Sequence, residues 1–427
     1  MINLEKNSPI LKYEKFKLTN GLTVILHPDN LSPIVTINLL YMVGAKDEVR
    51  GITGFSHLFE HLMFEGSKNI PKGMYDYYCT EVGGENNAYT TNDYTDYYIS
   101  LPSNFIELGL WMESDRMAGF LINQESLYTQ IDVVLEEKKQ TCDDTPYGNS
   151  TTQLRNISFD KNHPYSWDTI GTEEDIKDAT LEKVEMFYNQ YYTPNNSTLV
   201  ITGDFEIAET KLLVNKYFQD INPSLEVVNR FKQDKSLLEF GNSLVVNDPI
   251  APLNAVFMLF HLPEQNSPDY RALELLSTIL GDGESSRLYK TLEYQLEIAS
   301  DTESYIFEGS LCSMLFIYSI ADNNKISASK LEKEIINCIQ IIGSEGITVE
   351  ELEKAKNKNE SRINYYIQSL MNRAERLAYF SSFYDNPNMA FNESKLFSNI
   401  TIEDIKRVCN KYLVDQKHNS VSYFVNK

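Results

Sequence analysis

Two histidines and a glutamate lie close together in residues 54–66, GFSHLFEHLMFEG, where they form the pattern His57-x-x-Glu60-His61. On a helix, side chains four positions apart lie on one face, so His57 and His61 could bind a single zinc ion. Glu60 lies next to that face and could reach a water molecule on the metal. The pattern therefore predicts a metal site on a rigid helix, with Glu60 as a proton acceptor.

The residues around this pattern predict a buried helix. The flanking side chains are large and apolar: Phe55, Leu58, Phe59, Leu62 and Met63. Burying two imidazoles and a carboxylate among them is costly unless they have a partner, and a metal ion is a suitable partner. The alternative is a helix with two hydrogen-bonded histidines and a surface carboxylate. We prefer the metal site, because the chain has only six histidines and two of them stand at this spacing.

The composition predicts a globular protein of at least two domains. The chain has 427 residues, of which 42% are hydrophobic and 23% charged, and no apolar run approaches the length of a transmembrane helix. The net charge of −23 disfavours nucleic acid and anionic membranes as partners. An acidic chamber for basic peptides would explain this charge, but an acidic surface that aids solubility is the simpler explanation.

The cysteines and the first residues of the chain predict a reducing compartment. The five cysteines are odd in number and never form a Cys-x-x-Cys pair, which argues against a disulfide framework and a thiolate zinc site. Residues 1–7, MINLEKN, have neither the basic segment nor the apolar run of a signal peptide. We therefore expect a cytoplasmic protein, with an exported form whose signal has been removed as the alternative.

Strand and helix patterns alternate in the first half of the chain. Residues 15–26 resemble a β-hairpin with Asn20-Gly21 at its turn, and the β-branched run 34–43 resembles a central strand. A turn and two strands are expected at 83–102. Further helices are expected at 70–81, 103–117 and 127–141. These elements would hold the zinc helix against a sheet.

The second half of the chain repeats features of the first. Residues 180–192, TLEKVEMFYNQYY, align with residues 401–413, TIEDIKRVCNKYL, and each segment leads through an Asn-Ser pair into a strand. Residues 33–39 likewise resemble residues 252–258. A duplication with about two hundred residues per unit fits the ordinary size of a domain.

We therefore predict an α+β fold of two homologous domains, each a mostly antiparallel sheet packed with helices. The predicted boundaries are residues 1–220 for a zinc-binding domain, 221–236 for a linker and 237–427 for the second domain. The counterpart of the zinc helix should lie at residues 270–281, which contain several leucines and no histidine. The second domain would then form a wall of the substrate chamber without a metal.

The third metal ligand must come from elsewhere in the chain, because catalytic zinc usually has three protein ligands and a water molecule. The best candidates are Glu136 and Glu137 in residues 133–139, VVLEEKK. On an amphipathic helix one of the two faces inward, and the pattern alone leaves the choice open.

The chain resembles the pitrilysin/insulinase family of zinc metallopeptidases, inverzincins in which the common His-Glu-x-x-His order is reversed. The resemblance covers nearly the whole chain, and it points to the short branch with the mitochondrial processing peptidase β-subunit and bacterial processing peptidases. Besides the zinc pattern it rests on five segments: Val134-Leu135-Glu136-Glu137, Gly83-Gly84 followed by Asn87-Ala88-x-Thr90 and Tyr97-Tyr98, His163-Pro164-Tyr165, Ile170-Gly171-Thr172, and Ser286-Arg287-Leu288-Tyr289.

This resemblance implies a zinc-dependent endopeptidase that hydrolyses extended or unfolded peptides, with one Zn²⁺ per chain. It implies Glu137 as the third ligand, 76 positions after His61. Zinc would lower the pKa of its bound water towards about 7. Glu60 would take the proton of that water and later pass it to the leaving amine.

The resemblance also implies a strand that receives the substrate. Asn87, Ala88 and Thr90 would belong to an edge strand on which the peptide pairs as an added β-strand, with Asn87 as a polar contact to the peptide backbone. The alternative is that Ala88 and Thr90 are ordinary strand residues.

The sequence departs from the family pattern beside the predicted third ligand. Active members carry a second glutamate seven positions before that ligand, in the outer shell of the zinc site, whereas this chain has Gln130. Glutamine keeps its hydrogen bonding and loses the charge, and such changes often cost roughly 10–100-fold in metal affinity or activity. Weak zinc binding would be the consequence.

The second departure concerns an arginine and a tyrosine, seven positions apart, with which peptidases of this family hold the substrate. The corresponding positions here are Glu293 and Ser300, which have the wrong charge and too short a side chain. We therefore predict a heterodimer in which a sister subunit supplies the pair, with a homodimer as the alternative. Arg287 and Tyr289 are the alternative residues within this chain.

Together these features predict the metal-bearing subunit of a two-subunit clamshell, of which this chain forms half. The alternative is a catalytically weak or inactive structural subunit of the same family. Such members generally lack the zinc residues, whereas the predicted ligands and base are all present here.

Overall fold

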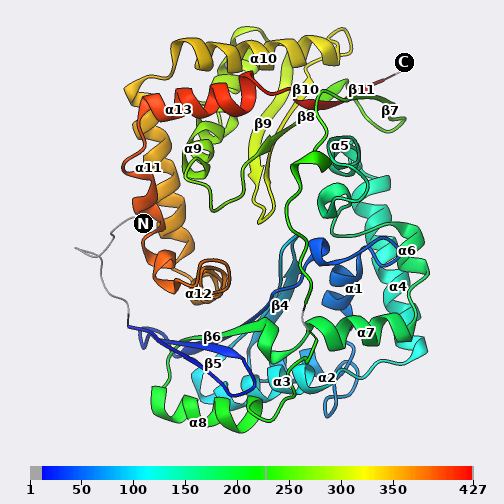
Figure 1. The fold of residues 1–427 in the computed structure, drawn as a ribbon, viewed down its shortest axis with the longest axis vertical. Coiled ribbons are helices and arrows are strands. Elements are labelled where there is room, and N and C mark those ends of the chain that lie inside the picture. The colour runs from blue at the N-terminus through cyan, green and yellow to red at the C-terminus, as the bar shows by residue number, and fades with distance from the viewer. Residues whose placement is uncertain (1–11, 227, 426–427) are drawn as a thin grey trace. The chain divides into compact units, whose positions relative to one another are not determined.

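The computed structural model describes residues 12–226 and 228–425. Residues 1–7, in which no signal peptide is apparent, lie outside this part of the chain. The described part is a mixed α+β fold with a six-stranded and a five-stranded sheet, each packed with helices (Figure 1). The predicted fold class is therefore confirmed.

The first sheet has the strand order β1-β2-β6-β3-β5-β4, in which only β2 and β6 are parallel. The strands are β1 (Glu14–Lys17), β2 (Thr23–Pro28), β3 (Ile34–Tyr41), β4 (Glu85–Thr90), β5 (Thr95–Pro102) and β6 (Ser197–Gly203). The predicted hairpin is confirmed, since β1 pairs with β2 across Gly21, whose φ of 94° favours glycine. Strand β4 lies at the edge of the sheet and pairs with β5 alone.

Helices cover both faces of the first sheet. One face carries the main core, which includes buried side chains of seven helices: α1 (Phe55–Leu62), α2 (Met74–Glu81), α3 (Ile106–Ala118), α4 (Gln124–Lys138), α6 (Glu173–Lys177), α7 (Leu181–Tyr191) and α8 (Ile207–Phe218). The opposite face packs against α12 (Leu370–Tyr384), whose Leu377 and Phe380 contact the strand residues Ile25, Leu40 and Val200 (Figure 1). A helix from the second half of the chain thus covers one face of the sheet that the first half forms.

The second sheet repeats the strand order of the first. Its order is β7-β11-β8-β10-β9, and only β7 and β11 are parallel. The strands are β7 (Ser243–Asn247), β8 (Ala255–Leu262), β9 (Ala299–Phe307), β10 (Ser313–Ala321) and β11 (Asn419–Phe424). Strands β7, β11, β8, β10 and β9 therefore occupy the places of β2, β6, β3, β5 and β4.

The helices of the second sheet follow the same plan. Helix α5 (Ser150–Ser158), from the first half of the chain, packs on β8 and β11 through Leu154. Helices α9 (Tyr270–Gly281), α10 (Ala328–Glu345) and α13 (Ile402–Cys409) pack with one another or with the strands β8, β9, β10 and β11. The predicted counterpart of the zinc helix is present, since α9 spans residues 270–281.

The chain forms two compact units that alternate along the sequence. One unit comprises the residues up to Leu135 with Thr169–Arg230 and Ile363–Glu393, and the other comprises Glu136–Asp168, Phe231–Arg362 and the residues from Ser394. The boundaries 1–220, 221–236 and 237–427 describe a repeat in the sequence, and they stay a prediction. Helix α11 (Val349–Tyr366) completes the α-helices of the described part of the chain. Within the described part of the chain, every helix is too short or too polar to cross a membrane.

Candidate metal centre

Helix α1 separates its apolar and polar side chains. Phe55, Leu58, Phe59 and Leu62 are buried in the main core of the first unit. His57, Glu60 and His61 are only half-buried and lie on the other side of the helix. The two imidazole rings stand one turn apart, with centroids 4.9 Å from each other and planes inclined by 82°.

Glu137 joins the two histidines from the last turn of α4. Ligand atoms of His57, His61 and Glu137 all lie within 4.8 Å of one another. The division into compact units falls within α4 after Leu135, but this helix is continuous to Lys138. Glu136 is exposed and accepts a hydrogen bond from Gln140 at 2.9 Å. Of these two glutamates, Glu137 is therefore the one that faces the histidines.

This donor set fits zinc. Two imidazoles and a carboxylate bind Zn²⁺ at roughly 2.0–2.2 Å, which requires ligand atoms about 3–4 Å apart, so small side-chain rotations would bring these three onto one ion. Three protein ligands leave a fourth position for water or substrate. Among residues 12–226 and 228–425, no other three histidine, cysteine, aspartate or glutamate side chains meet in this way.

A buried glutamate holds the beginning of α1. Glu48 is 3% exposed and accepts hydrogen bonds from the backbone N–H groups of Gly54 at 2.8 Å and Ser56 at 2.7 Å. Burial raises the pKa of Glu48 to about 8, although both hydrogen bonds oppose this shift. Sequence reasoning missed this residue, because a carboxylate seven positions before the first residue of a helix forms no recognised capping pattern.

The loop before α1 is fixed by a second carboxylate and two glycines. Asp175 accepts hydrogen bonds from the N–H and the hydroxyl group of Thr53 at 3.0 and 2.5 Å. A Cβ atom on Gly54 would lie 2.6 Å from the carbonyl oxygen of Ile170, and one on Gly171 would lie 2.5 Å from the Gly54 nitrogen. Both glycines have positive φ, of 85° and 73°. This close approach explains why the Ile170-Gly171-Thr172 segment accompanies the zinc pattern.

Glu60 contacts the edge strand β4. The hydroxyl group of Thr90, the last residue of β4, donates a hydrogen bond to Glu60 Oε2 at 2.8 Å. The same hydroxyl lies 3.3 Å from the carbonyl oxygen of Ser56. Thr90 therefore contacts the predicted base, a contact that the sequence did not indicate.

The residues predicted to receive the substrate occupy different environments on β4. Asn87 is exposed, whereas the side chain of Ala88 is buried in the core at 6% exposure. The N–H group of Thr91 donates to the carbonyl of Tyr94 on the β5 side. Because backbone direction alternates along an antiparallel strand, the backbone groups of Ala88 and Thr90 face away from β5. Ala88 can thus contribute its backbone to a ligand, but not its side chain.

Gln130 ties α4 to the segment that follows α1. Its side-chain amide donates a hydrogen bond to Glu65 Oε1 at 2.7 Å, and Lys72 forms an ion pair with Glu65 at 2.5 Å. Glu65 stands four positions after His61. The carboxylate that position 130 lacks is therefore present across the hydrogen bond, on a residue that sequence reasoning did not single out.

The two residues predicted to stand at the substrate-gripping positions lie in the second unit. Glu293 belongs to the π-helical segment Tyr289–Gln295, and Ser300 lies in β9, where its hydroxyl donates to the Ala321 carbonyl at 3.2 Å. The alternative residue Arg287 is engaged by Glu351, with a bond of 2.7 Å to Oε1 and one of 2.8 Å to Oε2. This arginine is therefore held within its own unit.

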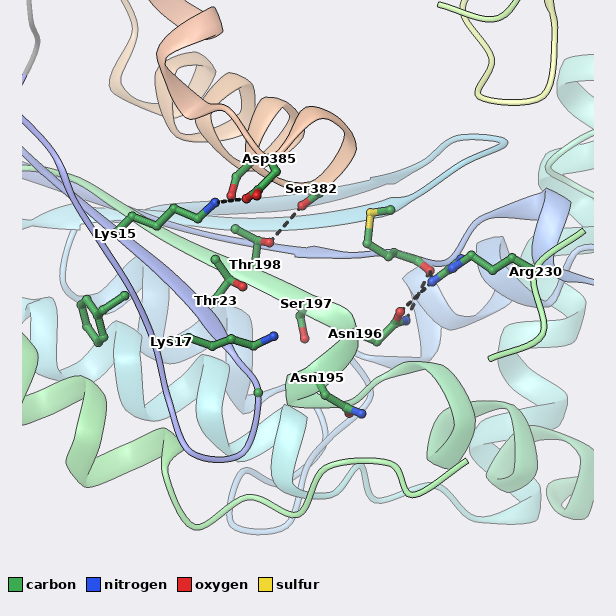
Figure 2. Close-up of a pocket in the computed structure, with 14 residues that line it drawn as sticks. Lys15, Lys17, Thr23, Asn195, Asn196, Ser197, Thr198, Arg230, Ser382 and Asp385 are labelled. Carbon is green, nitrogen blue, oxygen red and sulfur yellow. Dashed lines mark hydrogen bonds and ion pairs between the residues drawn. The ribbon is translucent and has the colours of Figure 1, made fainter. Parts of the chain in front are cut away.

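A polar pocket lies on the α12 face of the first sheet, with a volume of about 570 Å³ (Figure 2). Some of its side chains are bonded to one another: Lys15 pairs with Asp385 at 2.6 Å, and Thr198 bonds Ser382 at 2.9 Å. None of its lining residues belongs to the metal-ligand set. The pocket is thus separate from the chemistry of α1.

Both halves of the chain match models of one peptidase family. Residues 23–171 match the insulinase family, peptidase family M16, and residues 178–359 match the peptidase M16 inactive domain. The zinc protease PqqE of Helicobacter pylori is 26% identical over 423 residues, covering 98% of this chain and 94% of that protein. The uncharacterized zinc protease YmxG of Bacillus subtilis is 23% identical over 363 residues, covering 85% of this chain and 86% of that protein.

Solved structures show the same fold. The crystal structure of a protease from Helicobacter pylori superimposes with a TM-score of 0.89 at 27% identity, covering 97% of this chain and 100% of that one. A peptidase M16 inactive domain from Pseudomonas fluorescens superimposes with a TM-score of 0.87 at 16% identity, covering 98% of each chain. With both halves matched and relatives named as zinc proteases along nearly its whole length, the chain belongs to the pitrilysin/insulinase family of zinc peptidases.

Proposed function

We propose that this chain is a zinc-dependent endopeptidase that hydrolyses extended or unfolded peptides. The observation that carries the proposal is the meeting of His57, His61 and Glu137 beside Glu60. Two imidazoles and one carboxylate with an open fourth position are the ligand set of a catalytic zinc site rather than a structural one. Relatives named as zinc proteases support the same conclusion.

Glu60 would act as the general base and acid of the reaction. Zinc, when bound, would supply a Lewis acid that polarises the scissile carbonyl and makes water more acidic. Glu60 is one residue from His61 and does not belong to the ligand set, so its carboxylate is available to accept a proton from the attacking water. The same group would then donate that proton to the leaving amine nitrogen.

The substrate would be recognised mainly through its backbone. Strand β4 is at the edge of its sheet, and its last residue contacts Glu60. A peptide added along β4 would form hydrogen bonds with the outward-facing backbone groups of Ala88 and Thr90. Asn87 Oδ1, which accepts the Ala88 N–H at 2.9 Å, would be replaced by a carbonyl group of the peptide. Such recognition depends little on side chains and suits unfolded peptides.

We further propose that the chain works with a sister subunit. Glu293 and Ser300 stand where family peptidases have an arginine and a tyrosine, and neither side chain can hold a peptide carbonyl as that pair does. A sister chain with both residues would complete the site, and a homodimer is the alternative assembly.

The activity is tested with the purified full chain, its bound metal and an internally quenched peptide of mixed sequence. We expect about one zinc per chain and cleavage that a chelator abolishes and added zinc restores. A chain that binds no zinc, or binds zinc without cleaving any peptide alone or with its sister, would instead be a structural subunit. The partner is tested by adding the sister chain, which should increase the rate of cleavage; full activity of the chain alone contradicts the two-subunit assembly.

A further inference from the structure

We propose that Thr90 is a positioning residue that couples the edge strand β4 to the orientation of Glu60. The proposal rests on the proposed function, because it assigns a task to a residue that acts through the predicted base. Thr90 is part of the edge strand β4 and also contacts the predicted base. Its backbone faces the open edge of β4, and its hydroxyl group reaches the carboxylate of Glu60 at 2.8 Å.

The hydroxyl of Thr90 has two acceptors on α1, and their distances differ. Glu60 Oε2 lies at 2.8 Å and the Ser56 carbonyl at 3.3 Å. A hydrogen bond to an ionised carboxylate is shorter and about twice as strong as one to a neutral carbonyl. The carboxylate is therefore the preferred acceptor, and the carbonyl of Ser56 serves as a second acceptor if Glu60 turns away.

This hydrogen bond limits the rotation of the Glu60 carboxylate. With Oε2 held by Thr90, the other oxygen is the one left to accept a proton from water. A general base must reach its proton within about 2.6–3.2 Å, so a carboxylate free to rotate about its side-chain torsions would spend less time in a productive position. Thr90 would thus raise the fraction of time for which Glu60 is correctly placed.

The position of Thr90 on β4 connects this effect to the substrate. A peptide that pairs with β4 would bond to the backbone of Thr90 and hold the strand in place. The buried Ala88, two residues earlier, anchors the same strand in the core. Pairing of the peptide would therefore also steady the hydroxyl that orients Glu60. The rate of catalysis would then depend on backbone pairing, apart from any contact with substrate side chains.

The test compares Thr90→Val, which keeps the shape of the side chain without a donor, with Thr90→Ser, which keeps the donor. For Thr90→Val we expect kcat to fall roughly 10–100-fold, the cost of losing a hydrogen bond to a charged group, with KM within about twofold of the parent. Thr90→Ser should restore kcat to within about threefold. Zinc affinity, measured by competition with a chelator, should stay unchanged in both variants, because Thr90 contacts the base and not a ligand.

A matched control is present in the second sheet. Thr302 lies on the edge strand β9, and its hydroxyl bonds Ser319 at 2.9 Å. Thr302→Val removes a buried hydroxyl from an edge strand without touching Glu60, so it should change thermal unfolding but leave kcat unaltered. If Thr302→Val lowers kcat as much as Thr90→Val does, the loss of kcat in Thr90→Val comes from a general loss of stability, and the proposal is wrong.

The Glu60→Gln variant separates failure of this inference from failure of the proposed function. Full activity of Glu60→Gln refutes the proposed function, and the role of Thr90 with it. An inactive Glu60→Gln together with a fully active Thr90→Val refutes only the role of Thr90. Equal losses in Thr90→Val and Thr90→Ser, or a loss of zinc in either, also overturn it. In the Glu60→Gln background, Thr90→Val should cause no further loss of kcat.

Discussion

The two sheets of this protein share one strand order, but the helices that follow two equivalent strands differ in their side chains. In the first sheet β3 leads to α1, which presents two histidines and a glutamate on its half-buried side. In the second sheet β8 leads to α9 in the same topological place, and ten of the twelve residues of α9 are buried. The same scaffold thus holds a helix with the predicted metal ligands in one case and a core helix in the other.

The difference lies in a few polar residues and not in the framework. Helix α1 leaves one side uncovered and is fixed from its ends, by Glu48 at the beginning and by the segment with Glu65 after its end. Helix α9 is fixed by its own apolar side chains. A helix that must keep polar groups available cannot be held by packing on all sides, so its position depends on hydrogen bonds.

Removing a ligand tests whether the fold is independent of the metal chemistry, and it has the largest expected effect. His61→Ala should lose bound zinc and lower peptide cleavage to background, because two remaining ligands bind the ion weakly. The core side of α1 is unchanged, so far-UV circular dichroism should match the parent. His418→Ala, in the second unit, is the control and should keep its zinc. A His61→Ala protein that retains zinc would show that the ligand set is different.

Glu60→Gln removes the base while the ligands stay. We expect a loss of roughly 10²–10⁴-fold in kcat, the usual contribution of a general base, with zinc bound as in the parent. Metal analysis and steady-state kinetics of the same preparation check both parts. Wild-type kcat in this variant contradicts the role of Glu60, and loss of zinc would place Glu60 among the ligands.

A smaller effect is expected at the contact between Gln130 and Glu65. Gln130→Glu restores the residue typical of the family, but it places a carboxylate against Glu65 in a partly buried site. Like charges there should lower the free energy of unfolding by roughly 1–3 kcal/mol and weaken zinc binding about tenfold. The double variant Gln130→Glu with Glu65→Gln reverses the hydrogen bond and should return both quantities towards the parent.

The same substitution at Gln140 is the control for this contact. Gln140 also donates to a glutamate, Glu136, but this pair is exposed. Gln140→Glu should therefore change the free energy of unfolding by less than about 0.5 kcal/mol. Denaturant unfolding and chelator competition measure the parent and all three variants. An increase in stability or in zinc affinity in Gln130→Glu alone would contradict this interpretation of the contact between Gln130 and Glu65.

The hairpin at Gly21 and helix α1 could be predicted because they depend on turn residues and on the local spacing of apolar side chains. The repeat, and with it the position of α9, followed from the similarity of residues 180–192 to 401–413 and of residues 33–39 to 252–258. The choice between Glu136 and Glu137 did not follow, because it depends on which side of α4 faces α1. The resemblance to the family made that choice, and only Glu137 lies among the ligand atoms.

Contacts between distant segments were beyond sequence reasoning. Helix α12 covers the first sheet and α5 covers the second, so each half of the chain supplies a helix to the sheet of the other half. Glu48, Asp175 and Thr90 act through backbone groups or through one side chain on another element. Such contacts leave no periodic pattern, because their partners are brought together by tertiary packing.

The last expected effect concerns the pH dependence of stability and separates the two equivalent helices. Burial raises the pKa of Glu48 to about 8 against the N–H bonds of Gly54 and Ser56. The folded protein therefore binds a proton that the unfolded chain releases near pH 4.5, and the stability that Glu48 contributes is lost as pH rises towards 8. For one proton the slope is at most about 1.4 kcal/mol per pH unit.

At the beginning of α9 the pH dependence of stability has the opposite sign. Burial of Asp269 is outweighed by hydrogen bonds from Lys411, Arg407 and Tyr412, which lower the pKa of Asp269. Its contribution to stability is present above the unfolded pKa and is lost as pH falls through the lower folded pKa.

Glu48→Gln should therefore flatten the fall in unfolding free energy between pH 4.5 and 8, whereas Asp269→Asn should remove stability at neutral pH and have little effect in acid. Urea unfolding across this pH range measures both variants. Equal pH profiles for the parent and Glu48→Gln would mean that Glu48 is ionised throughout. In that case Glu48 would hold the beginning of α1 as a carboxylate, and both helices would begin beside an ionised acidic side chain.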